Sequence, residues 1–492
     1  MPRAFCYVFR AVLVVGGLAG VVYGYDLAVI SGALLFLQTQ FDLSASVAGF
    51  VTSSLLIGGL IGAAGAGVIA DWIGRKYSNL LAMLFTLIGT FVTVIAPSVE
   101  WLIIGRLIMG VGIGSLTVVV PLYIAELSPP MYRGTFVTVF QLATTFGIMM
   151  AYAVDTGFAS EGAWRWMFGV NLFPAVLAVI LLFFVPVSPR WLITKNREKH
   201  AVPILQRSIG RVDVDDVVRE IKTDIDTLRS GAFRDLFKRP VFKATVIGVL
   251  LMFIQQISGI NTVIYYAPII FQDAGFASDT AALVATTTVG VVNFMMTLVA
   301  VFLVDKWGRR PLLLLGVSLM ALCLAVLGLA FYLNTAISQY DLTHSISNSV
   351  TAGHTAVANA GEASDILKQQ SQVLSMGASW LSYVTIACVL VFISSFAFSL
   401  GPICFVVVSE IFPSHVRSKA IGLALAANWI GNIIVAQTFL VLIRGLGEAS
   451  TFWLYCVINI GAWVFILIFV PETKGQSLEA IEAKWLLKKQ HR

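Results

Sequence analysis

Long apolar runs, separated by short polar loops, cover most of the chain between residues 11 and 470. A helix that crosses a bilayer needs about 20 predominantly apolar residues, and twelve runs approach or exceed that length. They are residues 11–37, 47–70, 78–96, 101–125, 135–156, 167–185, 242–271, 281–304, 311–333, 381–409, 419–443 and 451–470. The first run is too long for the apolar core of a signal peptide and has no small-residue cleavage site. The pattern predicts an all-α membrane protein with twelve transmembrane helices.

The longest charged stretch, residues 187–241, divides the chain into two halves. Residues 1–186 and 242–470 each contain six predicted spans, and residues 471–492 form a tail. Within the charged stretch, aliphatic residues recur at helical spacing, which predicts an amphipathic helix beside the membrane rather than a thirteenth span. Residues 334–379 are polar and of low complexity, and we expect this insert to form a partly ordered cap on the second half.

Composition and charge agree with a membrane location. Hydrophobic residues make up 58% of the chain and charged residues 12%, with a mean hydropathy of +0.89, whereas soluble proteins contain about 25% charged residues. The net charge of +6 does not indicate a nucleic-acid partner, because the 32 Lys and Arg residues follow an alternating topology. Only Arg165, Lys368 and Arg444 fall in loops of the outer side, and Arg106 lies within a span. This bias predicts cytoplasmic termini, a cytoplasmic segment 187–241 and an outer segment 334–379.

Three pairs of motifs occur in the same order in the two halves, which indicates a duplicated six-helix unit. They are Asp71–Arg75 and Asp305–Arg309, Glu126–Arg133 and Glu410–Arg417, and Pro186–Arg190 and Pro471–Gly475. With these motifs the chain resembles the sugar porter family of the major facilitator superfamily over residues 10–485, apart from the insert. The stretches Gly162–Met167 and Ala427–Ile430 are most similar to bacterial galactose–proton and hexose–proton symporters. The resemblance implies two pseudo-symmetric six-helix bundles that carry a neutral monosaccharide and a proton by alternating access across the bacterial inner membrane.

Asp26 is the only acidic residue that we place deep within a predicted span, and Arg106 is the only deep basic residue. A carboxylate near mid-membrane costs about 2.5–3.5 kcal/mol, so it is expected to face a cavity and to mark an ion or proton path. Paired with Arg106, Asp26 is ionised; separated from it, Asp26 binds a proton. A static buried ion pair is the alternative. The resemblance favours proton coupling, because proton-coupled sugar porters carry an acid at this place and facilitative ones do not.

Uncharged amides within the spans are the candidates for substrate binding. They are Gln141, Gln255, Gln256, Asn261, Asn293 and Asn428. A carboxamide donates and accepts hydrogen bonds, as a sugar hydroxyl does, although packing between helices is the alternative for any one of them. Interrupted spans at corresponding places in two halves also point to a transporter's central site. The interruptions are Gly20 and Gly24, Ser258 and Gly259, and Gly401 and Pro402. The resemblance assigns the amides and Gly401 to sugar binding.

Aromatic residues near these amides are further candidates. Tyr23, Phe405 and Trp429 are placed to stack on a pyranose ring, and Tyr265 and Tyr266 to close over it. A lipid-facing or interfacial position is the alternative for each ring.

The charged residues of the paired loops are expected at cytoplasmic helix ends. They are Asp71, Arg75, Glu126, Arg133, Asp305, Arg309, Glu410 and Arg417. As isolated surface pairs they would contribute little stability. If they bridge the two bundles, they latch the outward-open state and release as the halves rock. The resemblance supports this gating role.

Four positions depart from the family pattern. Val187 stands where Glu is usual, and Phe405 stands where Trp is usual, which removes an indole N–H from the site. Ile148 and Asn171 stand where xylose symporters have Gln and Glu. The isoleucine is shared with hexose carriers and favours a hexose over a pentose.

No span contains a metal-ligand cluster, a nucleophile–histidine pair or a phosphate-binding glycine loop, so we expect no enzyme, catalytic residue, metal or cofactor. The sequence predicts a monomeric proton-coupled symporter for a monosaccharide, namely a hexose such as galactose or glucose. A facilitative sugar carrier and a proton-coupled pentose or polyol symporter are the alternatives within transport. A membrane sensor that binds sugar without moving it is the alternative from another class, and it is expected to carry a long signalling tail.

Overall fold

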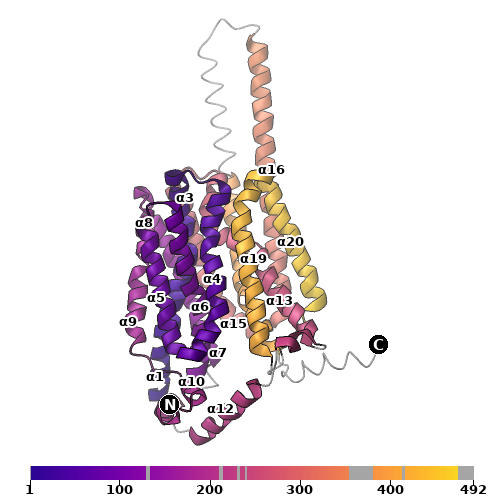
Figure 1. Ribbon diagram of the computed structural model, residues 1–492. Coiled ribbons are helices and arrows are strands. Elements are labelled where there is room, and N and C mark those ends of the chain that lie inside the picture. Colours follow the sequence, from indigo (N-terminus) through magenta and orange to yellow (C-terminus); the bar gives the residue numbers. More distant parts are fainter. Residues whose placement is uncertain are drawn as a thin grey trace, which may run out of the picture.

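The computed structural model of the protein is a bundle of long helices that run roughly side by side (Figure 1). It describes residues 2–128, 133–209, 214–229, 233–238, 241–353, 380–412 and 416–474. No strand occurs within these ranges. Eleven helical segments in them are long and apolar enough to cross a membrane. The remaining predicted span, residues 135–156, is covered by α7, which is described below.

The first half contains six membrane-length helices, of which the first is built from four pieces. Its elements are α1 (Pro2–Val12), the π-helix η1 (Leu13–Leu18), α2 (Ala19–Ala28), α3 (Ile30–Phe41), α4 (Ala45–Ile73), α5 (Arg75–Val94), α6 (Val99–Leu127), α7 (Arg133–Gly157), the 3-10 helix η3 (Ala159–Glu161), α8 (Trp164–Gly169) and α9 (Leu172–Leu182). The pieces α1 to α3 make up the span Tyr7–Phe41, and α8 and α9 make up the span Trp164–Leu182. Helix α7 covers the predicted run 135–156 and packs against α2, α6 and α15.

The charged segment 187–241 forms short helices, and the second half follows. The elements are α10 (Pro189–Thr194), α11 (Glu198–Ile209), α12 (Val214–Arg229), the 3-10 helix η4 (Phe233–Phe237), α13 (Val241–Ile257), α14 (Ile260–Asp273), α15 (Asp279–Trp307), α16 (Arg309–Gly353), α18 (Leu400–Ile411), α19 (Arg417–Leu446) and α20 (Glu448–Phe469). Helices α13 and α14 share the span Val241–Asp273, and α18 ends the span Trp380–Ile411.

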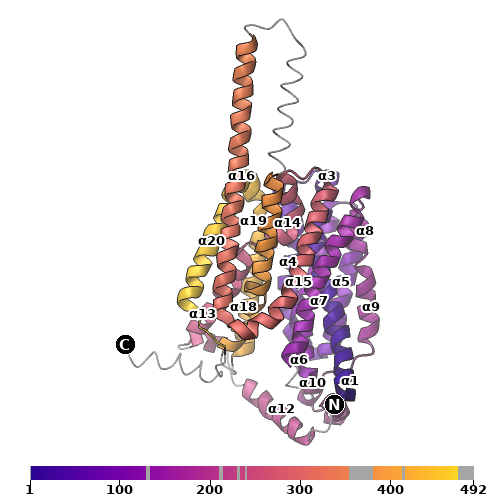
Figure 2. The same ribbon diagram turned by 180° about the vertical axis from the view of Figure 1, so that it is seen from behind.

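The two ends of the bundle differ. Helices α10 and α12 lie near the N-terminus at one end, which we call the linker end (Figures 1 and 2). At the opposite end, the α16 end, helix α16 projects well beyond the other helices (Figure 2). The part of the insert from residue 334 to 353 therefore continues α16 as a helix, and residues 354–379 lie outside the described part.

The two halves meet along α4 and α19 and along α7 and α15, and α14 also contacts α3. Hydrogen bonds join the halves near the α16 end. Ser53 Oγ donates to Gln437 Oε1 at 2.8 Å, and the Thr156 and Thr287 hydroxyls lie 2.8 Å apart. These neutral contacts hold the two halves together on that side.

The charge asymmetry of the loops predicts that the α16 end lies outside the cell, and cysteine labelling tests this prediction. An introduced Ser347→Cys, in the projecting part of α16, should react with a membrane-impermeant thiol reagent in intact cells. A variant that lacks the introduced cysteine is the control for the natural cysteines. Reaction only after the cells are permeabilised would reverse the predicted topology.

Candidate functional site

Two spans are broken inside the bundle, and the breaks bring polar groups together. The first span, by contrast, continues through Val29, which keeps helical backbone angles and whose N–H donates to the carbonyl of Tyr25. The span Val241–Asp273 breaks at Gly259, whose φ of 98° is a left-handed conformation that favours glycine. The span Trp380–Ile411 breaks at Ser399, just before α18. Because a broken helix leaves backbone groups without helical partners, polar side chains can bind at these places.

Four of the predicted amides form one network beside the break between α13 and α14. Gln255 donates through Nε2 to the carbonyl oxygen of Gly401 at 3.0 Å and accepts at Oε1 from Asn428 Nδ2 at 2.6 Å. Gln256 donates through Nε2 to Asn428 Oδ1 at 3.1 Å, and its Oε1 accepts from Asn261 Nδ2. The fold therefore unites residues from four helical elements, α13, α14, α18 and α19, as the sequence analysis expected.

The network is uncharged and partly accessible. Gln255 and Asn261 are buried, whereas Gln256 and Asn428 are half-buried. Each amide donates and accepts, so the cluster can replace its internal hydrogen bonds by bonds to the hydroxyl groups of a ligand. Such a site suits a neutral polyhydroxylated molecule better than an ion. No group of three His, Cys, Asp or Glu residues in the described ranges is placed to hold a metal ion.

The predicted aromatic residues occupy different environments. Trp429 is buried and packs against Gly59 of α4 in the other half, where an added Cβ would lie 2.5 Å from the indole ring. Tyr23 stacks on Phe140, with ring centroids 6.0 Å apart. Phe405 on α18 is 46% exposed. Trp429 is thus the ring that links the amide-bearing helix α19 to the first half.

Gln141 and Asn293 lie outside the amide network. Gln141 is half-buried on α7 and Asn293 is buried on α15, and these two helices pack together across the halves. Within the described ranges we find no hydrogen bond from either side chain to the network. Their binding roles therefore stay predictions.

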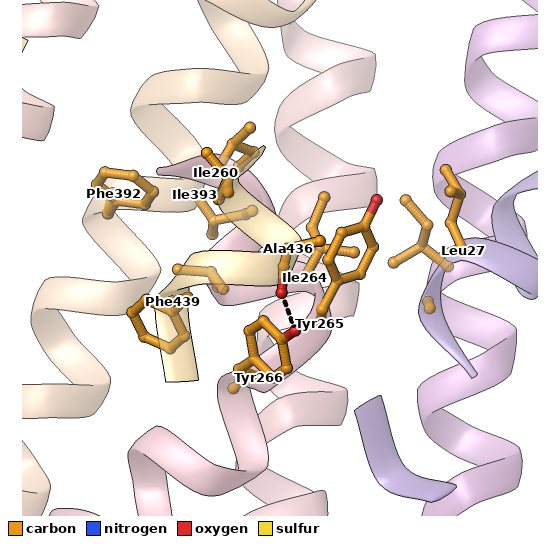
Figure 3. Close-up of a cluster of buried hydrophobic side chains, with 14 of the residues drawn as sticks. Leu27, Ile260, Ile264, Tyr265, Tyr266, Phe392, Ile393, Ala436 and Phe439 are labelled. Atoms are coloured by element: carbon orange, nitrogen blue, oxygen red, sulfur yellow. Dashed lines mark hydrogen bonds between the residues drawn. The ribbon is translucent and has the colours of Figure 1, made fainter. Parts of the chain in front are cut away.

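Tyr265 and Tyr266 are fully enclosed on α14 (Figure 3). The Tyr266 hydroxyl donates to the carbonyl oxygen of Ala436 at 2.5 Å, and its ring stacks on Phe439 with centroids 5.3 Å apart. The Tyr265 hydroxyl bonds to Asn432 of α19. The sequence analysis missed Asn432, although it lies four residues after Asn428 and so on the same face of its helix. Both tyrosines hold α14 against α19.

Asp26 is completely buried on α2, with 0% of its surface exposed. Its Oδ1 accepts a hydrogen bond from Asn171 Nδ2 at 2.6 Å, and its Oδ2 has no hydrogen-bond partner in the structure. Asn171 lies just before α9, at the position where the sequence departs from xylose symporters. The residue named as a departure is therefore the direct partner of the predicted proton carrier.

Arg106 is also completely buried, and it bonds to α4 rather than to Asp26. Helix α6 approaches α4 so closely that a Cβ on Gly110 would lie 2.1 Å from an α4 carbonyl oxygen. Because the two helices lie so close, Arg106 Nε on α6 donates to the carbonyl oxygen of Val51 on α4 at 2.8 Å, and Nη2 donates to the carbonyl oxygen of Thr52 at 3.4 Å. Its Nη1 has no partner, and no ion pair with Asp26 forms within 4.0 Å. Asp26 and Arg106 therefore form no direct ion pair here, and the predicted switch between them stays a prediction.

A second buried carboxyl group, Asp155, corrects the expectation that Asp26 is alone. Asp155 lies near the end of α7 and is 0% exposed. Its Oδ2 accepts the backbone N–H of Gly32 at 3.1 Å. It lies at the end of a predicted run, and α3 packs over it. An acidic residue inside the run 135–156 was the signal in the sequence.

The loop charges of the first half pair with one another at the linker end. Arg75 lies 3.0 Å from Asp71 and 2.9 Å from Glu126. Ser188 Oγ donates to Glu126 at 2.5 Å, so the residue after Val187 completes this cluster. The side chain of Arg133 lies outside the described part.

The second half repeats this arrangement. Arg309 lies 3.2 Å from Glu410, and Arg417 Nε donates to a carbonyl at 3.1 Å. Burial acts to raise the pKa of Glu472, but the backbone N–H groups of Arg309, Arg310 and two neighbours lower it overall. The side chain of Asp305 is not described. These ion pairs lie within one half each, and a bridge between the halves stays a prediction.

Comparison with known proteins agrees with this geometry. The family model described as "Sugar (and other) transporter" matches residues 12–485. The chain is 36% identical to the galactose-proton symporter of Escherichia coli strain K12, over 94% of this chain and 92% of that protein. It is 34% identical to the arabinose-proton symporter of Bacillus subtilis, over 96% and 93%. The inward-open structure of the xylose transporter XylE from E. coli superposes with a TM-score of 0.77 at 32% identity, covering 97% of this chain and 100% of that one. The chain therefore belongs to the sugar transporter family and has the twelve-helix fold of the major facilitator superfamily.

Proposed function

We propose that this protein is a proton-coupled monosaccharide symporter that imports a hexose across the bacterial inner membrane. It is a transporter and not an enzyme, because the family consists of membrane carriers. Two of the relatives named above are described as symporters, one of galactose and one of arabinose, with a proton, and the third is described as a xylose transporter. Ile148 favours a hexose among these sugars, because the family resemblance implies an isoleucine at this place in hexose carriers.

The observation that carries the proposal is the uncharged amide network at the broken spans, next to the half interface. Gln255, Gln256, Asn261 and Asn428 offer donors and acceptors in one place. Trp429 adds an aromatic face that reaches Gly59 of the other half. A sugar bound here contacts both halves, so its binding favours their movement relative to each other.

The buried carboxyl of Asp26 supports proton coupling over facilitative transport. It lies in the first half, whereas the network lies in the second, and it forms no direct ion pair with Arg106 that would neutralise a negative charge. A carboxyl group in such a site favours the neutral, protonated form. When Arg106 approaches, the charge is compensated and the proton can leave. Asn171 can donate to the Asp26 carboxyl group in either state.

We infer that the structure is the inward-facing state. The halves are joined near the α16 end, which the charge bias places outside. The ion pairs of the linker end lie within each half. When the α16 end opens, the linker end must close, and the charged groups of the two halves would then meet there. This is the latch of the outward-open state that the sequence predicts.

Counterflow in proteoliposomes tests the function directly. Labelled glucose, galactose, xylose and myo-inositol are compared with and without a pH gradient. Counterflow of a hexose together with proton-driven accumulation supports the proposal. Counterflow without any effect of the pH gradient indicates a facilitative carrier, and xylose or inositol as the preferred substrate indicates a pentose or polyol symporter.

Gln256→Ala is expected to weaken sugar binding by about 1–3 kcal/mol, because a substrate hydroxyl and the Asn428 amide lose a partner. Binding is measured by isothermal titration, and thermal unfolding should change much less. Gln272→Ala is the matched control, since Gln272 lies at the end of the same span outside the network. Unchanged affinity in folded Gln256→Ala would assign the residue to packing.

Asp26→Asn is expected to uncouple transport, because an asparagine imitates the permanently protonated acid and keeps an oxygen for the Asn171 donor. The variant should exchange sugar at equal pH on both sides but lose accumulation against a gradient. Sugar-induced alkalinisation of a lightly buffered cell suspension should also disappear. If Asp26 serves only in packing, exchange and accumulation should fall together, and a variant that still concentrates sugar would refute the coupling role.

A further inference from the structure

Asp155 is a buried carboxyl group that the proposed transport cycle does not use. It is 0% exposed, its Oδ2 accepts the Gly32 N–H, and its Oδ1 has no hydrogen-bond partner. No lysine, arginine or histidine of the described ranges forms an ion pair with it within 4.0 Å. The carboxyl group is thus sealed from water without a compensating cation.

The contact with Gly32 is closely fitted. A Cβ on Gly32 would lie 2.5 Å from the Cβ of Asp155 and 2.6 Å from its Oδ2, so only glycine permits this approach. Gly32 is the third residue of α3, and its N–H donates to Asp155 Oδ2. Asp155 therefore joins α7 to the first span, on which Asp26 lies six residues before Gly32.

Asp155 also lies between two residues that close the α16 end. On its own helix, Tyr152 donates to the carbonyl of Ile264 in the other half at 2.8 Å. Thr156 bonds to Thr287 of the other half at 2.8 Å. When these contacts part, water from the α16 end gains access to the carboxyl group behind them. The burial of Asp155 is therefore tied to the closed state of this end.

The groups that face Asp155 do not supply a positive charge. Tyr25 on α2 and Tyr152 on α7 lie close enough to interact with its charge, and both hydroxyls donate to backbone carbonyls. On α3 the contact is the backbone of Gly32. Arg165, a basic residue at this end of the first half, lies 4.2 Å over a tryptophan ring and donates to a carbonyl. An ionised Asp155 would remain uncompensated in this state.

We propose that Asp155 is a second proton-binding residue, which holds a proton whenever the α16 end is closed and exchanges it with outside water when that end opens. The inference rests on the proposed function and on the outer location of this end. An unpaired buried carboxylate is strongly disfavoured, so closing requires a proton on Asp155. This proton returns to the outer side and does not add to the one that Asp26 carries. Alkaline outside pH therefore opposes closure.

The pH dependence of sugar exchange separates Asp155 from Asp26. In Asp26→Asn, exchange at equal pH is expected to fall as pH rises, by up to about tenfold per pH unit once Asp155 in the open state is ionised. Adding Asp155→Asn should remove most of this fall, because an asparagine can still accept the Gly32 N–H and needs no proton. Glu161→Gln, which neutralises an exposed acid of η3, is the matched control and should leave the fall unchanged. An identical pH profile with and without Asp155→Asn overturns the proposal.

A second measurement does not depend on sugar. Ser53→Cys with Gln437→Cys places two thiols across the halves, where the native side chains lie 2.8 Å apart, and their oxidation to a disulfide by an added copper–phenanthroline oxidant reports closure. Cross-linking at alkaline pH should be several-fold slower with Asp155 than with Asp155→Asn, and thiol ionisation affects both alike. Equal cross-linking rates with and without Asp155→Asn overturn the proposal, even if the protein transports no sugar. If the cross-linking rates differ as expected but no sugar is exchanged, only the proposed function is contradicted.

Folding of the variants is itself informative. If Asp155 is protonated in the closed state, Asp155→Asn and Asp155→Ser are neutral acceptors that should fold. Failure of both to fold would show that the negative charge is required, and this outcome also overturns the proposal.

Discussion

The hydrocarbon core of a membrane supplies no hydrogen-bond partners, and this constraint governs the arrangement of every polar group inside the bundle. Arg106 meets it through two carbonyl oxygens of α4. Gln255, Gln256, Asn261 and Asn428 meet it by bonding to one another and to backbone carbonyls. The groups that remain unpaired, such as Asp26 Oδ2 and Arg106 Nη1, are the ones that a transport cycle can use.

The two ends of the molecule use different chemistry to hold their contacts. At the α16 end, hydroxyl and amide groups such as Ser53 and Gln437 join the halves, and each neutral hydrogen bond contributes only about 0.5–1.5 kcal/mol net. At the linker end the contacts are ion pairs within each half, and the pair of Arg75 and Glu126 is largely buried, with 10% and 5% of the two side chains exposed, so that losing either partner would be costly. The contacts that join the halves at the α16 end are therefore individually weak, so that opening of this end costs little, as alternating access requires.

Hydropathy along the chain was sufficient to predict the twelve spans, because each span must be apolar over its own length. The duplicated halves were indicated by the three pairs of motifs. The amides of α13, α14 and α19 were also identified, since uncharged polar residues are conspicuous in apolar runs. The burial of Asp155 was not predicted, because it depends on α3, which is distant in sequence. The same reason hid the partnership of Asn171 with Asp26. Pairing within each half at Arg75 and Arg309 was likewise decided by packing and not by the loop motifs.

The first span makes two buried carboxyl contacts that depend on different parts of the same motion. Asp26 lies in α2 beside Asn171 and forms no ion pair with Arg106, so its charge depends on how the site around α6 rearranges. Asp155 binds the backbone of Gly32 in α3, and its burial depends on the contacts between α7 and the second half. Because helical hydrogen bonds continue through Val29, the segments that carry Asp26 and Gly32 move together. A movement that opens the α16 end is thereby transmitted to the helix that holds Asp26, which links the closure of that end to the proton site.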